Sequence, residues 1–146
     1  MIKIVPDTNV LIRATLGFRS PQRKLLHMAM TGDLVLYGSE ETFKEFCDVI
    51  SRDRFKDFFK RNIYSLDQVV LNYKQYIKMK ELTPEIKSIK VPTKDPKDVV
   101  FFHIAKASGA KIIISEDKNH VLSVPRFDDI RTTDPENFLG CYNKIS

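Results

Sequence analysis

The sequence has little cysteine and no long apolar run, and each absence excludes a class of protein. Its two cysteines, Cys47 and Cys141, do not have the close spacing of a zinc-binding pair, so neither disulfide bonds nor a structural zinc ion should hold the fold together. No run of about 18 apolar residues is present to span a membrane, and the opening MIKIVPDTNV lacks the apolar stretch of a signal peptide. We therefore expect a cytoplasmic protein without a membrane anchor.

Internal repeats and Gly/Ser-rich linkers are also absent, so the 146 residues are expected to form a single domain, 1–146. Hydrophobic residues make up 42% of the chain and charged residues 29%, which indicates an ordinary globular protein with one core. Lys and Arg number 24 against 19 Asp and Glu, giving a net charge of +5. This surplus favours a polyanionic partner such as nucleic acid, although many basic proteins bind none.

Short apolar runs alternate with helical patterns along the chain. The runs typical of strands cover residues 2–5, 34–37, 86–91, 111–115 and 130–132. Helical patterns, several with a capping residue or an early proline, cover residues 21–30, 39–50, 53–62, 65–77, 95–108 and 135–139. This alternation predicts an α/β fold with a mostly parallel sheet covered by helices on both faces. In such a sheet the functional site lies beyond the carboxyl ends of the strands, where the strand order reverses.

Two acidic residues follow strands in this pattern. Asp7 comes directly after the first strand, and Asp117 comes after the apolar run at 111–115. Right-handed crossovers readily make these two strands neighbours, in which case both carboxylates face one crevice. Carboxylates clustered without His or Cys are the ligands that Mg²⁺ and Mn²⁺ prefer, and without a cation they would raise each other's pKa. The sequence therefore suggests a divalent metal.

Each acid also has a structural interpretation. An Asp after a strand is often a turn or helix-capping residue, and Asp95 before Pro96 fits a capping position, the role that we favour for it. Asp98 falls in the first turn of the same helix, where its charge complements the helix dipole. Glu45 lies off the apolar stripe of its helix, which by itself favours a solvated side chain. The histidines share no ligand spacing and are expected to be ordinary surface or partly packed residues: His27, His103 and His120.

Taken in order, these segments resemble the PIN domain, most closely the toxins of bacterial and archaeal toxin–antitoxin pairs. The resemblance runs through residues 7–10, 39–45, 95–98, 115–117 and 133–139. It implies a three-layer α/β/α fold with about five strands in the order 3-2-1-4-5. It also implies four carboxylates that bind Mg²⁺ or Mn²⁺ and carry the catalysis: Asp7, Glu45, Asp98 and Asp117. Asn9 and Ser115 match positions that orient these acids by hydrogen bonding, and Asp95 is given a similar supporting role.

The chain departs from the family pattern at several positions near these acids. Pro6 replaces an aliphatic residue, Val99 follows Asp98 in place of a frequent Asn, and His120 stands at a usually apolar position. Ser115-Glu116 replaces Thr-Gly before Asp117. All four acids are kept, and the departures bear on how tightly the metal is held and on whether Glu116 intrudes on the site.

The function that the resemblance implies is metal-dependent endonucleolytic cleavage of RNA. The expected partners are an RNA substrate, a small antitoxin protein and a second copy of the chain, the last two through apolar residues of the helices at 53–77. The basic residues expected to contact RNA are Arg13, Arg19, Arg23, Arg52, Arg54 and Lys56. The interleaved Phe55, Phe58 and Phe59 either stack on bases or belong to the core.

Two other functions are compatible with parts of the sequence. The domain could keep the fold and bind RNA or a protein without turnover, although a binding module has no need to gather four like charges. The segment at 7–10 also resembles the opening of haloacid-dehalogenase phosphatases. Those enzymes use a second Asp two residues after the first, and Asn9 at that position cannot exchange a proton as a carboxyl group can.

Overall fold

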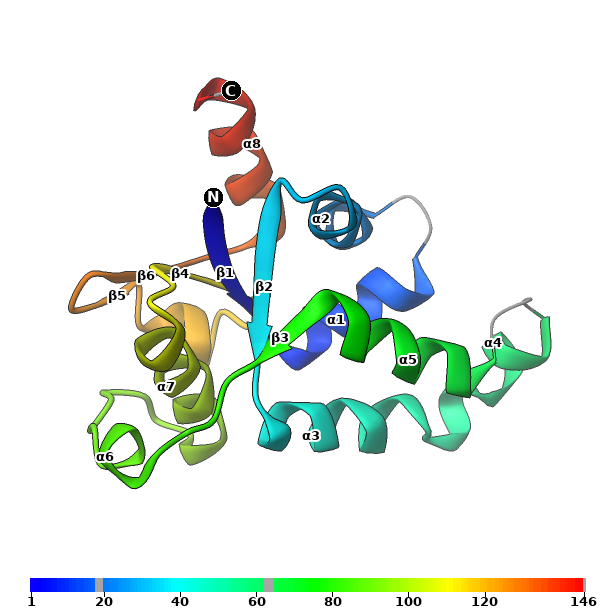
Figure 1. Ribbon diagram of the computed structural model, residues 1–146, viewed down its shortest axis with the longest axis horizontal. Coiled ribbons are helices and arrows are strands. Elements are labelled where there is room, and N and C mark those ends of the chain that lie inside the picture. Colours follow the sequence, from blue (N-terminus) through cyan, green and yellow to red (C-terminus); the bar gives the residue numbers. More distant parts are fainter. Residues whose placement is uncertain (18–19, 62–64, 146) are drawn as a thin grey trace.

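The computed structural model describes residues 1–17, 20–61 and 65–145 of the chain. Its strands form one sheet in the order β3-β2-β1-β4-β6-β5, parallel except for the pair β5–β6 (Figure 1). The strands are β1 (Ile2–Pro6), β2 (Leu34–Gly38), β3 (Ile77–Met79), β4 (Ile112–Ile114), β5 (Arg126–Phe127) and β6 (Ile130–Thr133). The strand order reverses between β1 and β4, which lie side by side at the middle of the sheet.

Helices cover both faces of this sheet. The α-helices are α1 (Thr8–Leu16), α2 (Pro21–Met30), α3 (Glu40–Ile50), α4 (Lys56–Arg61), α5 (Leu66–Tyr76), α6 (Pro84–Lys87), α7 (Val99–Ser108) and α8 (Pro135–Ile145). Three short 3-10 helices are η1 (Asp53–Phe55), η2 (Pro96–Asp98) and η3 (Val121–Ser123). Figure 1 shows α6 and α7 on one side of β1 and β2, and α3 and α5 on the other.

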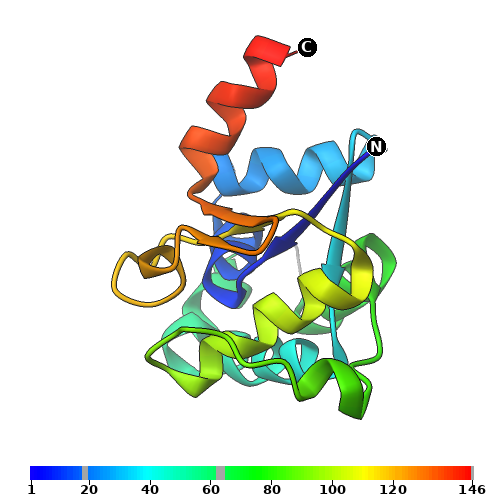
Figure 2. The same ribbon diagram turned by 90° about the vertical axis from the view of Figure 1, so that its left-hand side faces the viewer.

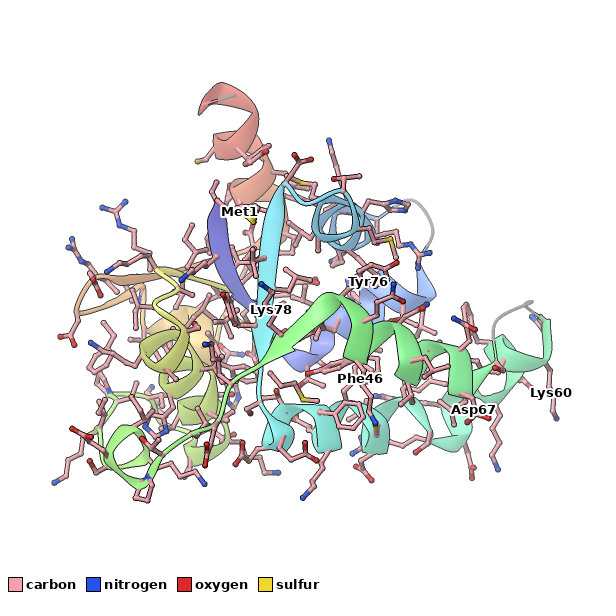
Figure 3. All side chains as sticks on the ribbon, in the orientation of Figure 1. Met1, Phe46, Lys60, Asp67, Tyr76 and Lys78 are labelled. Carbon is pink, nitrogen blue, oxygen red and sulfur yellow. The ribbon has the colours of Figure 1, made fainter. Side chains whose placement is uncertain are left out.

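The alternation of side chains along the strands divides the core into two parts. Ile4 and Ile114 belong to a cluster with residues of α1, α2, α3 and α5, whereas Val5 and Ile113 belong to a second cluster with α7. All four side chains are fully buried, because a central parallel strand has helices on both faces. On the first face, Phe46 of α3 lies between α3 and α5, with its ring 4.9 Å from that of Tyr73 (Figure 3). This is the predicted three-layer α/β/α arrangement.

The predicted order 3-2-1-4-5 is broadly compatible with the observed β3-β2-β1-β4-β6-β5, which has one additional edge strand, but one predicted strand falls on the wrong segment. Residues 86–91 form no strand; the preceding Thr83 caps α6 through a 3.3 Å bond from the Ile86 amide to its hydroxyl, and Pro84 opens that helix. The third parallel strand is β3, at the end of the segment predicted as the helix 65–77. Ile77 of β3 is buried beside β2, so packing against the sheet overrides the helical pattern.

Other differences from the predicted elements are smaller. Helix α1 has no counterpart among the predicted helices, and the closing helix extends to residue 145. The two-residue strand β5 adds an antiparallel edge beyond β6. The predicted helix 53–62 divides into η1 and α4, and its last residue lies outside the described residues.

The carboxyl-terminal helix extends away from the rest of the protein, beyond α2, in both ribbon views (Figure 2). Phe138 and Leu139 on its first turns are buried in the core cluster that includes α2. Across the described ranges, every helix is too short or too polar to cross a membrane.

Candidate metal centre

Asp7 forms the floor of the candidate site together with Ser115. It follows β1 directly, and its amide donates a 2.9 Å bond to the Ile114 carbonyl of the adjacent strand β4. Its Oδ1 accepts a 2.9 Å bond from the Val10 amide and so caps α1. The residue is only 5% exposed. Both the strand pairing and the helix cap therefore fix the carboxylate at the carboxyl end of β1.

Ser115 joins the ends of the two central strands. Its side chain is fully buried, and its hydroxyl donates a hydrogen bond to Asp7 Oδ2. The Ser115 hydroxyl oxygen also accepts a 3.1 Å bond from the Asp117 amide. The Ser115 amide in turn donates to Thr133 of β6, at 3.0 Å. One hydroxyl thus positions the Asp7 carboxylate and the backbone of Asp117.

The rim of the site consists of Asp95, Asp98, Asp117 and His120, which come from loops and helix ends. Asp95 caps η2 by accepting a 2.9 Å bond from the Lys97 amide, the structural role that we favoured for it. Asp98 occupies the capping position of α7 but makes no side-chain capping bond there. Its carboxylate is therefore available for other contacts, and its side chain is 15% exposed.

His120 contacts all three acids of the rim. Its Nδ1 lies 3.1 Å from Asp98 Oδ2 and 3.4 Å from Asp95 Oδ2, and its Nε2 lies 3.9 Å from Asp117 Oδ2. His120 is partly packed, as expected, but its contacts with the three acids were not predicted. The available signal was its position three residues after Asp117 in a turn, but Asp95 and Asp98 approach it only through the fold.

Burial and the charges of neighbouring acids disfavour the charged forms of Asp7 and Asp98. Burial is the main cause that raises the pKa of Asp7 to about 6, with further increases from the charges of Glu116 and Asp117. The hydrogen bonds from Ser115 and Val10 act in the opposite direction. The pKa of Asp98 is also raised, mainly by burial, although His120 lowers it.

A divalent cation suits this set of donors. Within the described ranges, Asp98 and Asp117 form ion pairs with His120 and with no Lys or Arg, and Asp7 forms none. Oxygen ligands from several carboxylates, gathered without a matching number of positive charges, are the chemistry that Mg²⁺ and Mn²⁺ complete. The charge of Asp117 acts on both Asp7 and Asp98, and the role of the three acids as metal ligands stays a prediction.

Two predicted site residues stand apart from this group. Glu45 is exposed on α3 and forms no hydrogen bond or ion pair with any described residue; its charge acts on the hydroxyl of Tyr73, whose pKa burial raises to about 12. Asn9 is exposed on the first turn of α1 and lines the same cleft as Asp117, with no side-chain hydrogen bond to an acid among the described residues. Their predicted roles stay predictions.

Glu116 is held by residues of α1 and α2. Its carboxylate forms a 3.2 Å ion pair with Arg13 of α1 and accepts a hydrogen bond from the buried Gln22 of α2. The carboxylate is thereby engaged by α1 and α2, while its charge still raises the pKa of Asp7.

An open cleft of about 740 Å³ adjoins the rim at Asp117. Its walls come from α1, η1 and the loop after β4, and they combine apolar, basic and amide side chains: Asn9, Ile12, Arg13, Leu16, Arg54, Phe55, Glu116, Asp117, Lys118 and Asn119. The guanidinium carbon of Arg54 lies 4.7 Å from the centre of the Phe55 ring. The cleft therefore offers a cation and an aromatic ring next to the acids.

The basic residues predicted to contact RNA differ in their surroundings. Arg13 and Arg54 line the cleft, whereas Arg52 and Lys56 pair with the nearby acids Asp48 and Asp53 at 3.1 and 2.8 Å. Arg23 donates a 3.0 Å bond to the Ala14 carbonyl, and Arg19 lies outside the described residues.

Among the three phenylalanines, Phe55 and Phe59 both pack against the core. Phe55 also lines the cleft. Phe58 faces a separate apolar pocket between α1, α2 and α5. Only one of the three is therefore placed to meet a ligand beside the acids.

Comparisons with known proteins agree with this architecture. Residues 3–119 match the family described as the PIN domain. The curated proteins contain no significant match, whereas eleven chains of solved structures match significantly. One is a chain of the crystal structure of VapBC2 from Rickettsia felis bound to a DNA fragment from their promoter. It is 9% identical, with a TM-score of 0.61 over 91% of this chain and 98% of that chain, so the likeness is one of fold.

Proposed function

Because the chain belongs to the PIN-domain family, whose members are generally nucleases, we propose that it is a divalent-metal-dependent endoribonuclease. The observation that carries the proposal is the position of Asp7 where the strand order reverses, with Asp117 joined to it through Ser115 and acting electrostatically on Asp98. Ligand sites of parallel α/β sheets lie at this point.

Asp7, Asp98 and Asp117 would hold Mg²⁺ or Mn²⁺, with Glu45 as the fourth carboxylate that the family resemblance supplies. When bound, such cations lower the pKa of a water molecule and offset the negative charge that develops on the leaving oxygen of a phosphodiester. Asp7 supplies a ligand whose position cannot drift, because Ser115 and the Val10 amide fix both of its oxygens. The more exposed Asp117 lies on the side that faces the cleft.

We propose that single-stranded RNA enters through the cleft beside Asp117. Phe55 is placed to stack on a base, and Arg54 and Lys118 on the same walls are placed to pair with phosphates. Arg13 would have to share its guanidinium between Glu116 and the substrate. A cleft that combines aromatic and basic side chains suits a flexible strand better than a duplex, whose bases are already stacked.

In the cell, we propose that the protein acts in the cytoplasm as the toxin of a toxin–antitoxin pair. The family resemblance supports this role, and so does the fold shared with a chain of the VapBC2 structure. A small antitoxin protein would then bind and silence it. Leu71, 60% exposed on α5, offers an apolar contact for that partner or for a second copy of the chain.

A cleavage assay tests the proposal. Purified protein is incubated with fluorescent single-stranded RNA and Mn²⁺, Mg²⁺ or EDTA, beside the variants Asp98→Asn and Asp57→Asn. Asp57 is an exposed acid of α4, so it matches the substitution without touching the site. We expect metal-dependent cleavage by the wild type and by Asp57→Asn, and its loss in Asp98→Asn.

Other outcomes point elsewhere. Equal cleavage by Asp98→Asn would place the activity at another site or in a contaminant. Binding of RNA or metal without cleavage by any form would favour a binding module over an enzyme. The haloacid-dehalogenase alternative has no support in the family match.

A further inference from the structure

The histidine of the rim lies where a ligand to a cation would lie. One ligand atom from each of Asp95, Asp98 and His120 falls within 4.8 Å of the other two. The spacings from His120 Nδ1 to the two carboxylates are 3.1 and 3.4 Å. Neighbouring ligands around an octahedral cation with bonds of about 2.1 Å are separated by about 3 Å, so these atoms are spaced to share one ion.

We infer that Asp95, Asp98 and His120 form a mixed oxygen–nitrogen site for a divalent transition metal. The inference rests on the proposed function and adds two residues, Asp95 and His120, to the carboxylate set. Magnesium is bound almost entirely through oxygen, whereas imidazole nitrogen is a ligand for transition metals. A histidine at this position therefore shifts the preference of the centre from Mg²⁺ toward divalent transition metals.

The three side chains can bind an ion without giving up their structural roles. Asp95 uses Oδ1 to cap η2, and it is the other oxygen, Oδ2, that faces His120. Asp98 makes no capping bond. The His120 side chain is 40% exposed, which leaves a path from solvent. Its backbone is fixed by a 2.5 Å bond from the Ser123 hydroxyl to its carbonyl.

The same contacts allow a competing role for His120. A protonated imidazole between Asp98 and Asp117 could act as an internal counter-ion that an incoming metal displaces. The two roles differ in one measurable property, because only a ligand forms a nitrogen–metal bond. The two roles also predict opposite changes in metal affinity when His120 is removed. Removing a ligand weakens metal binding, whereas removing a competing cation strengthens it.

Mn²⁺ bound to the full-length, chelator-stripped protein provides the test. Pulsed electron paramagnetic resonance detects coupling between Mn²⁺ and a directly bonded nitrogen. Wild type is compared with His120→Ala and with His27→Ala, a matched change at an exposed histidine of α2. We expect nitrogen coupling in the wild type and in His27→Ala, and its loss in His120→Ala.

Affinities measured by titration complete the test. Loss of a partner that only orients a ligand already weakens metal binding by about 10- to 100-fold, so His120→Ala should weaken Mn²⁺ binding at least about tenfold. The affinity for Mg²⁺, measured by competition, should change much less. Circular dichroism of the metal-free variants checks that they are folded.

Three results would overturn the inference. Bound Mn²⁺ without nitrogen coupling in the wild type would show that His120 is not a ligand, whatever happens to the variant. Unchanged or tighter Mn²⁺ binding by His120→Ala would identify a counter-ion. If the wild type bound no Mn²⁺ at all, both the inference and the proposed carboxylate centre would fail. The first two results, in contrast, would overturn the inference alone.

Discussion

The floor and the rim of the candidate centre hold negative charge in opposite ways. At the floor, Asp7 is almost completely buried and is held by neutral donors, the Ser115 hydroxyl and the Val10 amide. At the rim, Asp98 and Asp117 are more accessible to water and share a histidine. Neutral donors in a dry environment fix geometry but leave the charge uncompensated. In the proposed centre, the floor would set where a cation binds, and the rim would set which cation binds.

The largest effect should come from removing the charge at the floor. Asp7→Asn keeps a capping oxygen for α1 but loses a carboxylate that a cation needs, so we expect RNA cleavage to fall at least about a thousandfold. The measurement is the single-turnover cleavage rate in Mn²⁺. Cleavage within tenfold of the wild type would show that the floor is not part of the active centre.

The same variant should make the metal-free protein more stable at neutral pH. Folding raises the pKa of Asp7 from 3.8 to about 6, so the stability it contributes is present below about pH 3.8 and is lost as the pH rises through about 6. In EDTA, the wild type should lose about 2 kcal/mol of unfolding free energy between pH 4 and 7.5 that Asp7→Asn does not lose. Urea unfolding at both pH values measures the difference; parallel curves would contradict it.

Ser115 connects the floor to the rim, and its hydroxyl should matter through the carboxylate it orients. Ser115→Ala is expected to weaken Mn²⁺ binding by about 10- to 100-fold, as is typical for partners that orient metal ligands. Ser51→Ala removes a serine hydroxyl at the end of α3 and serves as the control. Equal affinities for the two variants would mean that strand pairing alone positions Asp7.

Beyond the rim, Phe55 should contribute to RNA binding and not to metal binding. Phe55→Leu keeps an apolar side chain in the partly buried position but removes the stacking surface, so we expect RNA affinity to fall about tenfold. Fluorescence anisotropy with catalytically inactive Asp98→Asn as the background provides the measurement. Unchanged affinity would assign Phe55 to the core alone.

The smallest effect concerns the basic residues predicted to contact RNA. Arg54→Gln should reduce the slope of log affinity against log salt by about 1, because it removes one phosphate contact at the cleft. The Arg52 guanidinium pairs with Asp48, so Arg52→Gln should change the slope less. If both substitutions had the same effect, the cleft would not be the path of the RNA.

The sequence predicted those parts of the site that depend on strand order. Asp7 and Asp117 follow apolar runs, and the right-handed crossover rule makes their strands neighbours, as the pairing of β1 with β4 confirms. The third strand could not be located, because Ile77–Met79 is short and continues a helical pattern, whereas residues 86–91 carry more apolar residues. Its position follows from packing against β2.

The role of His120 could not be predicted for a different reason. Its contacts Asp95 and Asp98 lie more than twenty residues away in the chain, so no local spacing identifies the group. Glu45 is the opposite case, because its role was predicted from the family resemblance and the structure does not test it. Its side chain is exposed on α3 and forms no hydrogen bond or ion pair with a described residue.

The placement of β4 beside β1 has a consequence for synthesis of the protein. The chain must reach residues 112–117 before Asp7 gains its neighbour Ser115 and before Asp117 exists, although β1 is made first. An amino-terminal fragment that ends before β4 contains Asp7, Glu45 and Asp98 but leaves one edge of β1 unpaired. The proposed centre would therefore assemble late, and an unfinished chain would lack it during translation.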